Sequence, residues 1–183
     1  MRITDLLDAR SVSLTSSPKT KSEALDQAVA LMTKSGKIND EEAYRSQVYA
    51  REEESTTGIG EGIAIPHGKC DAVTKPGLAA MVVKDGVEFD ALDGQPVTLM
   101  FLIAAPNTKD NVHLDVLSKL SVLMMDEVFA DALRNAKSAD EFLDIIDKAD
   151  AEQGDIDERL ADMNEASANG FKILAVTSCP TGI

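Results

Sequence analysis

The chain has 183 residues, of which 44% are hydrophobic, and a formal net charge of −14 at pH 7. This length allows one domain of about 150 residues with a tail and a substantial core. The negative charge argues against nucleic acid and anionic membranes as partners, because they would repel such a surface, and favours basic proteins. No segment has the ~20 apolar residues of a membrane span, and the N-terminus lacks the apolar core of a signal peptide, so we expect a cytoplasmic protein.

Two helices are predicted in the first third of the chain. Thr20 and Glu23 form a capping box ahead of a helical segment that stops at Gly36. Asn39 and Glu42 repeat the pattern for a second helix, which we expect to run through residue 50.

The middle of the chain is strand-like. Apolar runs bounded by Gly or Pro occupy residues 61–67, 77–89 and 96–106. The sequence LMFLIAA, within the third run, is apolar on both faces, which predicts a central strand covered by helices on both sides.

Two further helices are predicted after the strands. One runs from about Asn111 to Asn135 with its core residues at helical spacing, and Ser138 with Glu141 opens the last one. The core residues of the first are Val116, Leu117, Leu120, Leu123, Met124 and Val128. The order of elements predicts a three-layer α/β/α sandwich. Residues 149–170 are acidic and poor in large apolar residues, so we interpret them as a solvated, partly helical linker.

The run GIGEGIAIPHGK, residues 58–69, sets His67 in a glycine-punctuated turn just after an apolar strand. Glycines let backbone amides approach an anion closely, and Pro66 fixes the chain so that the imidazole can be aimed. A neutral imidazole has one ring nitrogen free to attack phosphorus. The alternative is that His67 only ends a strand and caps a turn.

These residues also carry a family resemblance. REEESTTGIGEGIAIPHGK, followed by His113 in DNVHLDVLSKLS, resembles the enzyme IIA domains of the fructose and mannitol type in the bacterial sugar phosphotransferase system. The C-terminal KILAVTSCPTGI is similar to the opening of a fructose-type enzyme IIB domain, whose phosphorylated cysteine would be Cys179. The resemblance implies a mixed sheet, an enzyme IIA-like domain over 1–148, the linker over 149–170, and the start of a second domain over 171–183.

The resemblance also implies a function. The resemblance implies that the chain is a phosphotransferase. His67 would accept a phosphoryl group from the phosphocarrier protein HPr and pass it to an enzyme IIB cysteine, and the sugar would be taken up through the membrane enzyme IIC. No cofactor is implied, and fructose is the family default. The first alternative is a regulatory, nitrogen-related enzyme IIA that acts by binding partners. The second is a metal-dependent hydrolase built on His67, His113 and Asp115.

The matching positions supply the rest of the predicted site. Arg51 would grip two phosphate oxygens, although an arginine at a helix end often only pairs with nearby carboxylates. His113, in the first turn of its helix, would be a neutral donor to the phosphoryl oxygens, or alternatively a histidine at the edge of the core. Hydroxyls and amides that we expect to bind phosphate belong to Thr56, Thr57, Gly58 and Gly68.

The other polar residues near the predicted site receive simpler interpretations. Glu52, Glu53 and Glu54 are expected to form a solvated face. Cys70 lies three residues after His67, but with His113 it makes an incomplete ligand set, so no metal site is predicted. The terminal strand 172–178 would lack the neighbouring strands of its own domain, and if ordered it could promote dimers through its edge. Whether this segment is free or ordered, Cys179 should accept no phosphate from His67.

Overall fold

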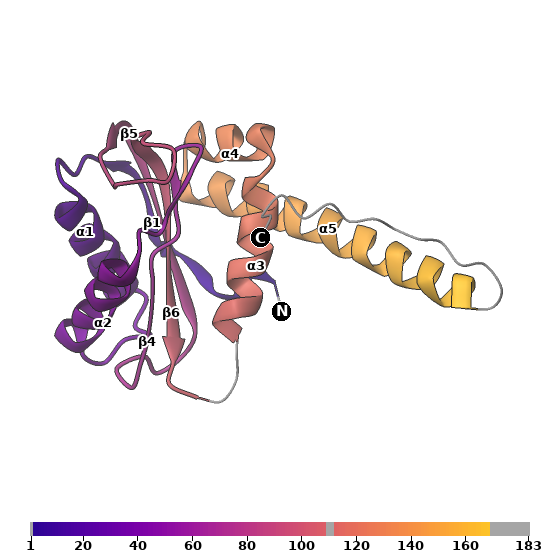
Figure 1. Cartoon of the computed structure of the whole chain (residues 1–183), viewed down its shortest axis with the longest axis horizontal. Helices are drawn as coiled ribbons and strands as arrows, with labels where there is room; N and C mark the ends of the chain where they lie inside the picture. Colours follow the sequence, from indigo (N-terminus) through magenta and orange to yellow (C-terminus); the bar gives the residue numbers. More distant parts are fainter. Residues whose placement is uncertain (1, 109–111, 169–183) are drawn as a thin grey trace.

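A computed structural model describes the backbone of residues 2–108 and 112–168, and the side chains of residues 2–108 and 114–157. A central sheet has α1 and α2 on one face and α3, α4 and α5 on the other (Figure 1). This arrangement confirms the predicted α/β/α sandwich. Its elements are η1 (Ile3–Asp5), β1 (Leu7–Ser16), α1 (Lys21–Lys34), α2 (Glu41–Glu54), β2 (Gly58–Gly60), β3 (Ile63–Ala64), β4 (His67–Cys70), β5 (Gly77–Val87), β6 (Val97–Pro106), α3 (Val112–Met124), α4 (Glu127–Arg134) and α5 (Ala139–Ala168).

The sheet is mixed, as expected, with the strand order β1-β5-β6-β3-β2 and with β4 also on β6. β5 runs antiparallel to β6, whereas β3 and β4 run parallel to it. Ile63 pairs with Leu99 and His67 with Ile103, so β3 and β4 share one register along β6. They are separated at Pro66, which has no N–H to give to the ladder. His67 is therefore the first residue of a strand, not a turn residue after one.

Two apolar cores lie on the two faces of the sheet. Successive residues of β5 and β6 alternate between them, as the period of a strand requires. Met81, Met100 and Leu102 pack toward α1 and α2, whereas Phe101 and Ile103 pack toward α3, α4 and α5. β6 is thus the doubly covered central strand that its sequence predicts.

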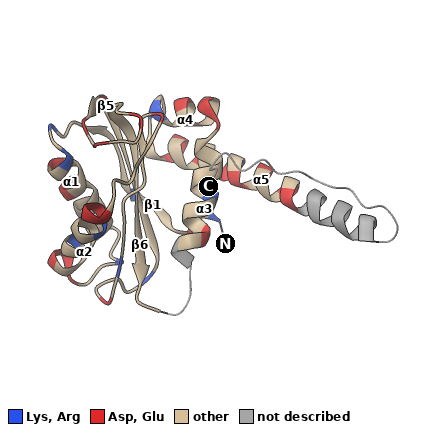
Figure 2. Ribbon diagram, in the orientation of Figure 1, with Lys and Arg blue, Asp and Glu red and all other residues tan. Residues whose placement is uncertain are grey.

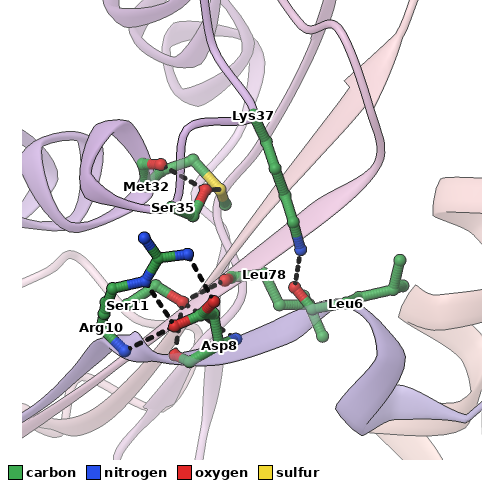
Figure 3. A network of polar contacts seen from close by, with 8 residues as sticks. All are labelled: Leu6, Asp8, Arg10, Ser11, Met32, Ser35, Lys37 and Leu78. Atoms are coloured by element: carbon green, nitrogen blue, oxygen red, sulfur yellow. Dashed lines mark hydrogen bonds and ion pairs between the residues drawn. The ribbon is translucent and has the colours of Figure 1, made fainter.

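β1 was not among the predicted strands. Its pairing with β5 is irregular between Leu7 and Val12, where the Ser11 hydroxyl lies 2.8 Å from the carbonyl oxygen of Asp8 and 2.9 Å from that of Leu78. Arg10 donates to the Asp8 carboxylate through its backbone N–H, Nε and Nη2 (Figure 3). These polar residues interrupt the apolar alternation by which a strand is recognised.

The first two helices begin at side chains that cap their N-termini. Thr20 accepts from the Glu23 amide and Gly36 follows α1 with a φ of 74°, both as predicted. The cap of α2 is Asp40, not Asn39, and its carboxylate accepts from the Ala43 amide. α2 also continues to its end at residue 54, which brings Arg51 into its last turn.

The predicted helix over Asn111–Asn135 is two helices. Asp126 accepts hydrogen bonds from the amides of Val128 and Phe129, so it is the N-cap of α4, and α3 ends two residues before it. The direction of the chain changes there, and Val128, predicted to be in the core, is 79% exposed.

The last helix begins as predicted, because Ser138 accepts from the Glu141 amide and Glu141 accepts from the Lys137 amide. It then runs for 30 residues, about 45 Å, and its second half projects from the domain (Figure 1). The segment predicted to be a partly helical linker is therefore helical as far as residue 168. Acidic residues occur on helices of both layers (Figure 2). Within the described ranges, none of the helices is long and apolar enough to cross a membrane.

Candidate functional site

The structure brings Arg51 and His67 together. Arg51 lies in the last turn of α2, and its Nε donates to Nε2 of His67 at 3.1 Å. Its Nη1 lies 3.2 Å from the Ser55 carbonyl oxygen and 3.3 Å from the Ser55 hydroxyl. The guanidinium is thus held between the first residue after α2 and the imidazole, and both side chains remain partly accessible.

The surrounding contacts define which ring nitrogen of His67 carries a proton. Nδ1 lies 3.2 Å from the carbonyl oxygen of Ile65, which can only accept a hydrogen bond. Nδ1 therefore donates, and the lone pair of the neutral ring is at Nε2, where Arg51 donates. The nitrogen with the lone pair is the one that faces the guanidinium.

The two threonines of the predicted site are engaged within the protein. The Thr56 hydroxyl donates to the carbonyl oxygen of Phe89 at 3.1 Å and accepts from the Gly58 amide. Both donors of Thr57 go to Glu52. Phosphate binding by these residues stays a prediction, since in this arrangement their donors hold the turn in place. Close packing also explains why residue 58 is glycine, because a Cβ there would lie 2.8 Å from Cα of Ala91.

Gly68 allows α2 to approach β4 closely. A Cβ at Gly68 would lie 3.0 Å from the ring of Tyr44 and 3.0 Å from Cγ2 of Val48. Tyr44 is fully buried, and its hydroxyl donates to the carbonyl oxygen of Ile103, the residue paired with His67. Burial raises the pKa of Tyr44 well above its ordinary value, so the hydroxyl stays a donor. Phosphate binding by the Gly68 amide stays a prediction.

Glu52 is not on a solvated face, contrary to the prediction for the three successive glutamates. Its side chain is 5% exposed and accepts from the Thr57 amide at 2.9 Å and the Thr57 hydroxyl at 2.5 Å. Lys21, at the start of α1, lies 2.9 Å from its Oε1. Spacing in the sequence does not indicate this partner, because Lys21 is remote in the chain. The helical position of Glu52, four residues after the buried Val48, is a signal of its burial.

Other predicted site residues lie partly or wholly outside the described part of the chain. His113 is the second residue of α3, in its first turn as predicted, and only its backbone is described. Cys179 and the predicted strand 172–178 are outside the described residues, as is any dimer contact through them. Cys70 is a half-buried free thiol packed against the core beside α1 and α2. Among the described side chains, no group of three or more His, Cys, Asp or Glu is placed to hold a metal ion.

The chain belongs to the family "Phosphoenolpyruvate-dependent sugar phosphotransferase system, EIIA 2", whose model matches residues 5–149. It is 45% identical, over all 183 residues, to the fructose-specific EIIABC component of Bacillus subtilis, and covers 29% of that protein's length. It is 38% identical over 135 residues to the fructose-specific EIIA component of Haloferax volcanii, covering 74% of this chain and 88% of that protein.

Solved structures show the same fold. The nitrogen regulatory protein IIA-Ntr from Neisseria meningitidis aligns with 79% of this chain and 98% of its own, with a TM-score of 0.74 and 30% identity. Enzyme IIA of the Escherichia coli mannitol system, solved in complex with phosphorylated enzyme IIB, aligns with 77% of this chain and 98% of its own, with a TM-score of 0.67 and 30% identity. The predicted enzyme class, a phosphotransferase with a phosphohistidine intermediate, is confirmed by this family membership.

Proposed function

We propose that this chain is the phosphocarrier part of a fructose-type uptake system, which accepts a phosphoryl group from HPr on His67 and passes it to an enzyme IIB cysteine. The observation that carries the proposal is the geometry at His67, where the contacts of Nδ1 and Nε2 leave the lone pair at Nε2, beside Arg51. The 45% identity to a fructose-specific EIIABC component supports the choice of sugar and of the enzyme IIB partner.

The transfer follows from these contacts. The Nε2 lone pair of His67 forms the bond to phosphorus as the bond between phosphorus and the donor atom of HPr breaks. Arg51 must first withdraw its Nε–H from that lone pair. Its guanidinium then lies beside the incoming phosphoryl group, where it binds the oxygens that carry the charge. The Nδ1–H bond to Ile65 keeps the ring oriented and stabilises the positive charge that develops on it.

A regulatory role is the second candidate, because the nitrogen regulatory protein from N. meningitidis has the same fold with a TM-score of 0.74. Against it stands the match to the fructose-specific protein of B. subtilis, which extends over the whole chain and includes the C-terminal residues beyond the enzyme IIA family match. We therefore favour transport.

The test uses the chain with phosphoenolpyruvate, enzyme I and HPr, followed by a fructose-type enzyme IIB domain. Intact mass should show one added phosphate after the first step, and this phosphate should leave the chain when enzyme IIB is added. A regulatory protein would keep its phosphate in the second step. If HPr adds no phosphate, the proposed function is wrong.

A further inference from the structure

The buried carboxylate of Glu52 lies next to the site but is not part of the proposed chemistry. Glu52 follows Arg51 on α2, and adjacent helical residues point in different directions, so Arg51 reaches His67 while Glu52 points into the protein. The carboxylate accepts hydrogen bonds from the Thr57 amide and the Thr57 hydroxyl, and it forms an ion pair with the Lys21 ammonium. A buried carboxylate with these donors holds its partners rigidly. If one donor moved away, a buried charged oxygen would lose a hydrogen bond or ion pair, which is costly.

The Glu52 carboxylate holds the turn that follows α2. Thr57 is fixed to Glu52, and Thr56 beside it is fixed to the carbonyl oxygen of Phe89. Lys21 pairs with Glu52 and also lies 4.8 Å from the centre of the Phe89 ring. The two residues that hold the turn, Glu52 and Phe89, therefore belong to one cluster. The residue just before Thr56 is Ser55.

Ser55 connects the cluster to the site. Its carbonyl and hydroxyl oxygens both accept from Nη1 of Arg51, whose Nε donates to His67. A continuous path of contacts therefore runs from the buried carboxylate through the turn to the guanidinium. If the turn were free, Arg51 would lose the oxygens that fix its orientation.

We propose that Glu52 is a positioning residue: through Thr57 and Ser55 it holds the Arg51 guanidinium against Nε2 of His67. It does not touch the phosphoryl group. The effect on transfer rests on the proposed function, whereas the effect on the hydrogen bond between Arg51 and His67 does not.

The experiment compares Glu52→Ala, Glu52→Gln and Thr57→Val in the full chain. Glu54→Ala, an exposed glutamate on the same helix, is the matched control. NMR follows the Arg51 Nε–H resonance, assigned by its absence in Arg51→Lys, and the nitrogen shift of His67 Nε2. A rapid-mixing assay follows transfer from phosphorylated HPr.

We expect Glu52→Ala to weaken or lose the Arg51 Nε–H signal and to slow transfer about 10- to 100-fold, which is the effect expected when one electrostatic contact is misplaced. Glu52→Gln keeps an oxygen for the Thr57 amide and should retain most of both readouts, and Glu54→Ala should match the unmodified chain. A folded Glu52→Ala with an unchanged Arg51 signal would overturn the proposal.

Because Glu52→Ala removes the buried carboxylate that pairs with Lys21 and leaves it the exposed Asp90 at 3.6 Å, the variant could fail to fold, and Thr57→Val is the second route. It removes only the hydroxyl that donates to Glu52 and leaves the ion pair in place. A weakened Arg51 signal in folded Thr57→Val supports the proposal, and an unchanged signal contradicts it. If the unmodified chain takes no phosphate from HPr, the proposed function fails, while the NMR comparison still decides the role of Glu52.

Discussion

Nε of Arg51 donates a hydrogen bond to Nε2 of His67 at 3.1 Å, so the guanidinium lies against the ring nitrogen on which we propose the phosphoryl group is accepted. This contact has two consequences. It holds the imidazole with its lone pair toward Arg51, and it keeps a cation within reach of any anion that replaces the hydrogen bond. In the proposed transfer, the same residue would therefore orient the acceptor before the phosphoryl group arrives and neutralise its charge afterwards.

Arg51→Ala should slow transfer from phosphorylated HPr by about 10- to 1,000-fold, because one charged donor to the phosphoryl oxygens is lost. Arg51→Lys should recover little of the rate, since an ammonium cannot contact Ser55 and His67 through two separate nitrogens as the guanidinium does. Single-turnover measurements with saturating donor test this. Wild-type rates in both variants would place Arg51 outside the site.

Gly68→Ala should destabilise the fold by about 1–3 kcal/mol, because its Cβ would press against the Tyr44 ring and Val48 in a closely packed contact. Urea unfolding gives the difference directly. Gly154→Ala is the control: apart from the backbone of its own helix, no atom would lie within 4 Å of the added Cβ, and in a helix the change should add about 0.5–1 kcal/mol of stability. Unchanged stability in Gly68→Ala would mean that α2 and β4 adjust freely.

Asp8→Asn should lower stability at neutral pH and have little effect in strong acid. Hydrogen bonds from Arg10 lower the pKa of Asp8 from 3.8 to about 2. The folded state thus favours the ionised form, and this contribution is present above about pH 4 and is lost as pH falls through 2. Asp8 is 34% exposed, so solvent screening reduces the effect to about 1 kcal/mol.

Urea titrations of Asp8→Asn between pH 2 and 7 measure this difference, with Asp71→Asn, at an exposed position after β4, as the control. The stabilities of Asp8→Asn and the unmodified chain should converge toward pH 2. A difference that is constant with pH would show that the carboxylate acts through its shape and not its charge.

Local patterns predicted much of the fold. Capping residues such as Thr20 and Ser138 mark helix starts because the partner amide lies three residues away, and a run in β6 that is apolar on both faces predicts a central strand. The errors occur where a local pattern is interrupted. Ser11 and its neighbours break the alternation of β1, and Asp126 begins a new helix inside an apolar periodicity that continues past it.

Two residues of the predicted site, Arg51 and His67, lie in contact, and their roles in phosphoryl transfer stay predictions. The fold also buries Glu52, which the sequence pattern predicts to lie on the surface. Three successive glutamates resemble a solvated face, and only the fold brings Lys21 to one of them. Partners remote in the chain are set by packing, which sequence spacing does not contain.

The most direct test of the central claim is to locate the phosphate on the labelled chain. A chain labelled with nitrogen-15 in histidine, phosphorylated through enzyme I and HPr, allows the modified ring nitrogen to be identified by its coupling to phosphorus. We predict a single phosphate on Nε2 of His67, with Nδ1 still protonated toward Ile65, and no phosphate on His67→Ala. A phosphate on Nδ1 of His67, or one on His113 that persists in His67→Ala, would contradict the account.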